Sequence, residues 1–102
     1  MENTVKKRLI PITMTYSDDN VWSMTTSEEG YGKFAIKTTP ENLRKAMLRM
    51  KFKNQDDTAN SHRSVKYMDM VTELTTKGSA TFYCWKSKYP KTREDLENLA
   101  NN

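Results

Sequence analysis

The residues in this sequence best suited to metal or nucleophilic chemistry are its one histidine and its one cysteine. His62 follows Asp56 and Asp57, which raises the possibility of a metal site, but a zinc site needs more nitrogen or sulfur ligands than this segment offers. Cys84 and His62 could also form a thiol–imidazole pair. Cys84, however, lies in the aromatic run FYCWK, where a buried and inert thiol is more common. We therefore predict a solvated loop histidine, an unreactive cysteine, and no metal or cofactor.

Two further patterns have the residue types of a catalytic or phosphate-binding site without its spacing. The acid pairs Asp18–Asp19 and Glu28–Glu29 fall in polar connections, where carboxylates stay hydrated, whereas acid–base catalysis needs one of a pair to be desolvated. The segment GYGK, residues 30–33, lacks the third glycine of a dinucleotide fingerprint and leads into a strand instead of a helix. We predict that this segment is a hairpin turn and that the protein is not an enzyme.

The distribution of charge is more informative than any of these motifs. Residues 1–53 carry ten Lys and Arg against six Asp and Glu, whereas residues 54–102 carry seven of each, so the formal net charge of +4 lies in the N-terminal half. Such an asymmetry is typical of a surface that meets nucleic acid or an acidic protein.

The first predicted helix lies in the segment TTPENLRKAMLRMKFK, residues 38–53. Thr39 followed by Pro40 is typical of a helix cap and a first helical residue. Apolar residues then recur at helical spacing as far as Phe52. We therefore expect a helix from residue 40 to about residue 52, with its apolar stripe in the core.

Cations spaced by four residues form a ridge on the side of this helix away from the apolar stripe: Lys45, Arg49 and Lys53. No acid interrupts them, and like charges at this spacing cost a helix roughly a few tenths of a kcal/mol per pair. We expect the ridge, with the neighbouring Arg44 and Lys51, to be exposed and to contact an anionic partner. A helix face kept basic for solubility alone is the alternative.

A second basic segment, WKSKYPK at residues 85–91, combines cations with aromatic side chains. Aromatic rings beside Lys or Arg can stack on nucleic-acid bases, whereas core packing is the alternative in a chain with few apolar residues. We expect exposed binding residues here as well: Trp85, Lys86, Lys88 and Tyr89.

The remaining pattern predicts the elements that must position these residues. Short segments rich in β-forming residues predict three antiparallel strands in a meander and a fourth strand later in the chain: residues 8–16, 21–26, 33–38 and 79–87. Pro11 cannot donate a ladder hydrogen bond, so the first strand should lie at a sheet edge or have a free side there. A short helix over residues 92–100, capped by Thr92, comes last.

The segment SVKYMDMVTELTTK, residues 64–77, gives conflicting signals. Its β-branched residues favour a strand. Its periodicity favours a helix with one apolar side and one acidic side, and a strand would place the acids on the apolar face, so we predict a helix. The apolar side holds Tyr67, Met68, Met70, Val71 and Leu74, and the other side holds Lys66, Asp69, Glu73 and Lys77. We expect Tyr67, Val71 and Leu74 to be buried and Asp69 and Glu73 to be exposed.

Together these elements predict one α+β domain over residues 1–102, a small antiparallel sheet covered by helices in the order β-β-β-α-α-β-α. We expect residues 1–6 and 101–102 to be frayed. No apolar run reaches the roughly 18 residues that a membrane helix needs, and no secretory signal is visible. One cysteine permits no internal disulfide, so the expected location is the cytoplasm.

Two non-catalytic functions fit this sequence. The first is a regulator or inhibitor that covers an acidic surface of another protein, such as an enzyme that handles nucleic acids, with the basic ridge steering association and exposed Met and aromatic side chains as anchors. The second is direct binding of nucleic acid by the same ridge. We place the regulator first, because acids are nearly as numerous as cations and no nucleic-acid-binding motif is present. A short chain with seven Met and no catalytic signature is also typical of small phage and mobile-element proteins.

Overall fold

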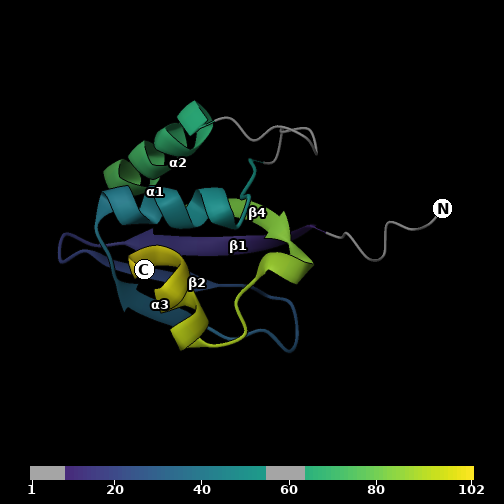
Figure 1. The fold of residues 1–102 in the computed structure, drawn as a ribbon. Coiled ribbons are helices and arrows are strands. Elements are labelled where there is room, and N and C mark those ends of the chain that lie inside the picture. Colours follow the sequence, from purple (N-terminus) through teal and green to yellow (C-terminus); the bar gives the residue numbers. More distant parts are fainter. Residues whose placement is uncertain (1–8, 55–63) are drawn as a thin grey trace.

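The computed structural model describes residues 9–54 and 64–102 and arranges them as one sheet with helices (Figure 1). In chain order the elements are β1 (Leu9–Tyr16), β2 (Val21–Thr25), β3 (Phe34–Lys37), α1 (Pro40–Arg49), α2 (Ser64–Lys77), β4 (Ser79–Trp85), the short 3-10 turn η2 (Lys86–Lys88) and α3 (Arg93–Asn101). The α+β class and the predicted order are confirmed. Three of the predictions fall outside the described residues: the frayed residues 1–6, His62, and the Asp56–Asp57 pair.

The sheet is antiparallel throughout, with the strand order β3-β2-β1-β4. The first three strands form the predicted meander, and β4 pairs with β1 along most of its length, so Pro11 lies in a central strand and not at a sheet edge. Its partner on β4 is Tyr83, whose own backbone groups bond to Lys53 on the far side. On the other side β2 ends at Thr25, before any residue could stand opposite Pro11. The free side that proline needs is therefore present within a central strand.

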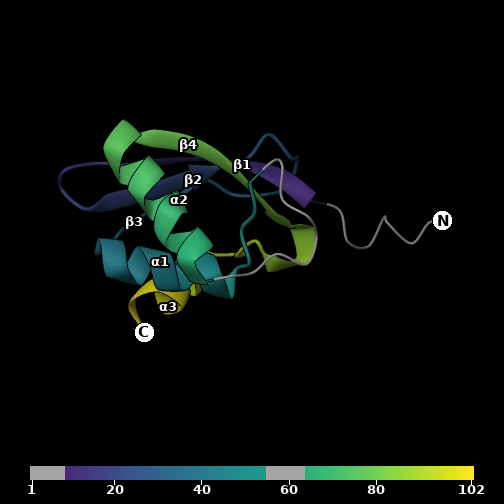
Figure 2. The same ribbon diagram turned by 90° about the horizontal axis from the view of Figure 1, so that it is seen from above.

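The three described helices lie on one side of the sheet, with α1 between α2 and α3 (Figures 1 and 2). Even-numbered strand residues face these helices and supply the sheet's part of the core. The fully buried ones are Ile10, Ile12, Met14, Trp22, Met24, Ile36, Phe82 and Cys84. Odd-numbered strand residues, such as Thr13 and Thr81, point to the opposite face, which no described helix covers. Removing the even-numbered side chains from water is the main force that holds the two layers together.

Local sequence determines where two of the helices begin. The Thr39 hydroxyl accepts the backbone N–H of Asn42 at 3.2 Å, and Pro40 follows as the first residue of α1. Thr92 caps α3 in the same way, accepting the N–H of Asp95 at 3.0 Å. Each cap satisfies a backbone donor that the first helical turn leaves without a partner, and both caps were predicted.

The ambiguous segment forms α2 over the predicted residues, and its orientation is also as predicted. Tyr67 and Leu74 are fully buried, and Val71 is only 9% exposed. Asp69 is exposed and Glu73 is half-exposed. Periodicity prevailed over β propensity here because one side of the helix meets both α1 and the sheet.

α1 ends at Arg49, earlier than predicted, because the chain reverses direction there. Lys51 adopts a left-handed backbone conformation with φ 57°. Its N–H bonds to the Leu48 carbonyl at 3.1 Å, and the N–H of Phe52 bonds to the Met47 carbonyl at 3.1 Å. This pair of bonds is a Schellman motif with lysine at the position where glycine is usual. The motif turns Phe52 into the core, so an apolar residue that matches the helical period is not itself helical.

Side chains of α3 cover the outer edge of β3. Arg93 Nε donates to the Ala35 carbonyl at 3.1 Å, and Asn101 Nδ2 donates to the Lys37 carbonyl at 2.9 Å. Asn101 also accepts the Thr38 hydroxyl at 2.8 Å. Asn101, which we predicted to be frayed, is the last residue of α3 and makes these bonds. These bonds occupy edge carbonyls that a further strand would otherwise use.

Candidate binding surfaces

The predicted binding residues do not form one continuous ridge. Arg44, Lys45 and Arg49 lie on α1, which packs on the helical side of the sheet. The other predicted residues follow the end of α1 or the end of β4, and these two ends lie at the same end of the molecule (Figure 1).

Lys53 departs most from its predicted position. Its side chain was expected to be exposed and is fully buried. Its N–H donates to the Tyr83 carbonyl at 2.7 Å, and its carbonyl accepts the Tyr83 N–H at 2.8 Å, so it extends the sheet beyond β4. Its Nζ lies 5.9 Å from the centroid of the Trp85 ring, within the range of a cation–π interaction. Because α1 ends at Arg49, Lys53 cannot continue the helical line from Lys45, and the predicted geometry of the ridge is wrong.

The cations of α1 differ in what they contact. Arg49 is exposed, but its Nη1 donates to the Leu99 carbonyl at 2.7 Å near the C-terminal end of α3. A cation there satisfies a terminal carbonyl and interacts favourably with the helix dipole. Lys45 is exposed and Arg44 is half-buried, and neither side chain makes a hydrogen bond or ion pair within residues 9–54 and 64–102.

Tyr89 was predicted to be an exposed contact and is instead part of the core, with 4% of its surface exposed. Its hydroxyl donates to the Gly32 carbonyl at 2.5 Å. Its ring meets the Tyr31 ring edge to face, with centroids 5.5 Å apart. Tyr89 therefore fastens the segment after β4 to the β2–β3 connection, which is a structural role.

The pairing of Lys53 with Tyr83 brings together two basic segments that contain no acid. Residues 42–54 and 74–93 lack Asp and Glu and hold ten of the 17 Lys and Arg in the chain. Lys86, Lys88 and Lys91 are exposed, Lys51 is half-buried, and the Lys86 Nζ lies 5.9 Å from the Tyr31 ring. We call these four lysines the basic end. The sequence analysis did not name Lys91 as a binding residue, although the absence of acids from residue 74 to residue 93 could have identified it. Nothing in the sequence linked Tyr31 to Lys86.

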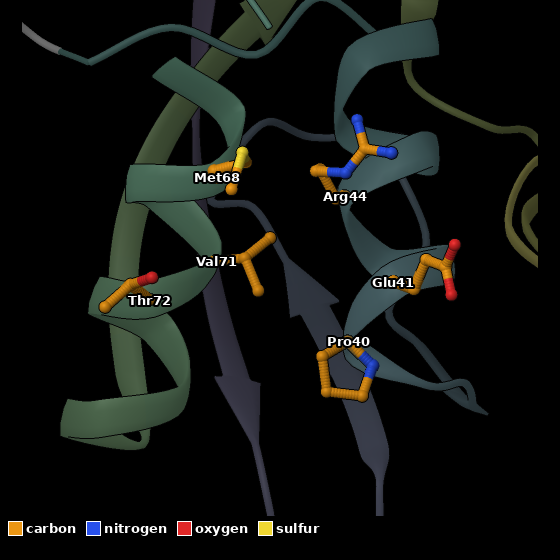
Figure 3. Close-up of a pocket in the computed structure, with 6 residues that line it drawn as sticks. All are labelled: Pro40, Glu41, Arg44, Met68, Val71 and Thr72. Carbon is orange, nitrogen blue, oxygen red and sulfur yellow. The ribbon is translucent and has the colours of Figure 1, made fainter. Parts of the chain in front are cut away.

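A groove of about 530 Å³ lies between α1 and α2 (Figure 3). Met68 on α2 is 55% exposed, and no other large apolar side chain among the described residues is exposed. The sequence placed Met68 on the apolar side of this helix, and its exposure corrects that prediction. Met68 lies about 100° around the helix from Tyr67, at the margin of the apolar arc. The lining residues are Pro40, Glu41, Arg44, Met68, Val71 and Thr72.

Burial strongly raises the pKa of two side chains, Cys84 and Tyr89. Burial raises the pKa of the Cys84 thiol to about 12. Burial, with a smaller contribution from the charge of Cys84, raises the pKa of Tyr89 to about 12. At neutral pH the thiol is protonated and fully buried, so it is a poor nucleophile.

We expect these two groups to make the fold less stable as the pH rises from about 9 to about 12. In the unfolded chain the cysteine ionises near 9.0 and the tyrosine near 10.0, whereas both keep their protons in the folded state up to about 12. The unfolded state binds fewer protons in this window, so raising the pH favours unfolding, while below pH 9 the contribution is fully present. Urea unfolding at several pH values will measure this. Between pH 9 and pH 12 the free energy of unfolding of Cys84→Ala should fall less than that of wild type. An equal fall in the two proteins would contradict the raised pKa of Cys84.

We expect Lys53→Ala to lower the free energy of unfolding by about 1–3 kcal/mol, because it removes a buried aliphatic stem and a cation–π contact. Lys45→Ala is the matched control, since Lys45 is exposed on α1, and its effect should stay within about 0.5 kcal/mol. Lys53→Met, which retains most of the stem, should fall between the two. Chemical denaturation of the three variants is the measurement, and equal effects for Lys53→Ala and Lys45→Ala would show that Lys53 is ordinary surface.

Neither a metal centre nor a membrane span is found in the part of the chain that the structure describes. No three His, Cys, Asp or Glu side chains among residues 9–54 and 64–102 come together as a possible metal site. Each described helix is too short or too polar to cross a bilayer. No protein-family model, curated protein or solved structure matches the chain.

Proposed function

We propose that this protein is a non-catalytic binding protein that covers an acidic surface of a partner protein and regulates the partner by occlusion. The observation that supports this is the Lys53–Tyr83 pairing, which brings two acid-free segments together so that the basic end is exposed on a folded surface. A group of cations on a surface attracts an anionic surface, speeds the encounter and disfavours basic partners.

The local cost of this arrangement also supports a binding role. Lys51 adopts the left-handed conformation with φ 57°. A residue with a Cβ loses roughly 1 kcal/mol there relative to glycine. Lys86 and Lys88 lie on a short turn with no acid in the same segment. A lysine at a position that suits glycine costs the fold some stability, which is consistent with a residue retained for its charge.

The aromatic side chains favour a protein partner over nucleic acid. Stacking on bases needs exposed ring faces. The Trp85 and Tyr31 rings each have a lysine Nζ at 5.9 Å, and the Tyr89 ring is buried. Direct binding of nucleic acid is the second candidate, supported by the exposed lysines of the basic end, which can contact phosphates regardless of sequence.

We expect the double variant Lys86→Gln with Lys88→Gln to keep the fold and to associate with the acidic partner roughly fivefold more slowly, with a weaker dependence on salt. The matched control is Lys37→Gln with Lys77→Gln, which removes the same charge from exposed residues near the opposite end of the sheet. Partners captured from cell extract with each variant, followed by association kinetics at two salt concentrations, provide the measurement. Equal rates for the two double variants would show that the basic end is not the contact.

The same proteins should be titrated with mixed-sequence duplex and single-stranded nucleic acid at both salt concentrations. Binding that weakens steeply with salt and depends on Lys86 and Lys88 would favour the second candidate. Absence of binding at low salt would exclude it and leave the protein partner.

A further inference from the structure

The groove between α1 and α2 has an apolar floor. Met68 and Val71 point from α2 toward α1, and Pro40 lies at the other end of the gap (Figure 3). A single exposed methionine is ordinary on a protein surface. Here it lies in a concave site, and its flexible, polarisable side chain adapts readily to the shape of a partner.

The rim of the groove carries one cation and one anion, Arg44 and Glu41. The Arg44 side chain is half-buried and makes no hydrogen bond or ion pair with any described residue. The Glu41 carboxylate points away from α2 (Figure 3). Pro40 is the first residue of α1, and the N-terminal end of a helix carries a partial positive charge.

We propose that this groove binds a short segment of an acidic partner protein, which places an apolar side chain against Met68 and Val71 and a carboxylate against Arg44. The proposal rests on the proposed function and specifies one contact within it. A guanidinium and a carboxylate can form two parallel hydrogen bonds, which fixes the orientation of the segment. A volume of about 530 Å³ accommodates a few side chains and not a folded domain.

Charge complementarity favours this occupant over a second copy of the chain. A twofold contact centred on the groove would place the same surface on both sides. It would bring two Arg44 side chains together, while the Glu41 carboxylates point away from α2 (Figure 3). A segment from an acidic protein supplies a carboxylate to Arg44.

The test is a titration of the isotope-labelled full chain, followed by NMR, with three synthetic peptides of equal length. The first combines Leu and Glu at helical spacing, the second replaces Glu with Lys, and the third replaces Leu with Ser. We expect the Leu–Glu peptide to shift the resonances of Met68, Val71 and Thr72 and to bind most tightly. Arg44→Gln and Met68→Ser should each weaken it about tenfold, whereas Lys37→Gln, at an exposed position on β3, should change its affinity less than twofold.

Each other outcome would overturn the groove assignment. Equal binding of the Leu–Lys peptide would remove the role of Arg44, and equal binding of the Ser–Glu peptide would remove the role of the apolar floor. Binding that depends on Lys88 but not on Arg44 would place the acidic partner at the basic end, so that the proposed function stands and the groove fails. Self-association that buries Met68, detected by sedimentation, would identify the occupant as a second copy. If no peptide binds while the Lys86 and Lys88 variant still loses its cellular partner, the groove is not the anchor.

Discussion

Replacing Trp22 with Ala will lower the free energy of unfolding by about 3–5 kcal/mol, a large part of the roughly 5–15 kcal/mol that stabilises a typical domain. Trp22 is the largest fully buried side chain in the described residues. It lies on β2 between Tyr16 on β1 and Ile36 on β3 and faces the helices. No neighbour can fill the space that alanine would leave without moving strands that are fixed on both sides.

Trp22→Phe will separate the effect of ring volume from that of the indole N–H. The Trp22 Nε1 is buried and has no hydrogen-bond partner among the described residues. A buried donor without a partner costs about 1–3 kcal/mol, so removing it offsets part of the packing lost with the smaller ring. We expect a net loss of about 1 kcal/mol, measured by urea unfolding followed by circular dichroism. If the Phe and Ala variants lose the same stability, the account of Nε1 is wrong.

Leu74→Ala will lower the free energy of unfolding by about 2–5 kcal/mol. Leu74 is fully buried on the side of α2 that carries Tyr67 and Met70, where the helix packs against α1 and the sheet. Thr76→Ala on the same helix is the matched control. Thr76 is exposed, and alanine is a better helix former, so its effect should be within about 0.5 kcal/mol of zero.

Chemical denaturation of both α2 variants under the same conditions is the measurement. A large loss in Leu74→Ala alone would show that α2 contributes stability through its buried side. Similar small changes in the two variants would mean that α2 does not depend on this packing.

The sequence by itself determined those features of the fold that depend on residues close together in the chain. The Thr39 hydroxyl caps α1 by accepting the backbone N–H of Asn42, three residues later in the chain. Pro40, between them, restricts the backbone at the first helical position. The identity of α2 followed from the angular positions of Tyr67, Leu74 and Asp69, because only a helix separates them onto opposite sides. The β-β-β-α-α-β-α order is the sum of such local effects. For the candidate sites, exposure of Lys45 and Lys86 also followed from local pattern.

The tertiary structure alone decided where α1 ends and which cations remain on the surface. Periodicity extends a helix for as long as apolar residues recur, and Phe52 satisfies that pattern. The helix stops because two other arrangements use the backbone groups that a longer helix would need. The turn at Lys51 places Phe52 in the core, and Lys53 pairs with Tyr83 on a distant strand. The pairing with Tyr83 places Lys53 in the interior, and contacts with Gly32 and Tyr31 hold the buried Tyr89. Such outcomes are not encoded locally, because each depends on which segment the folded chain brings alongside.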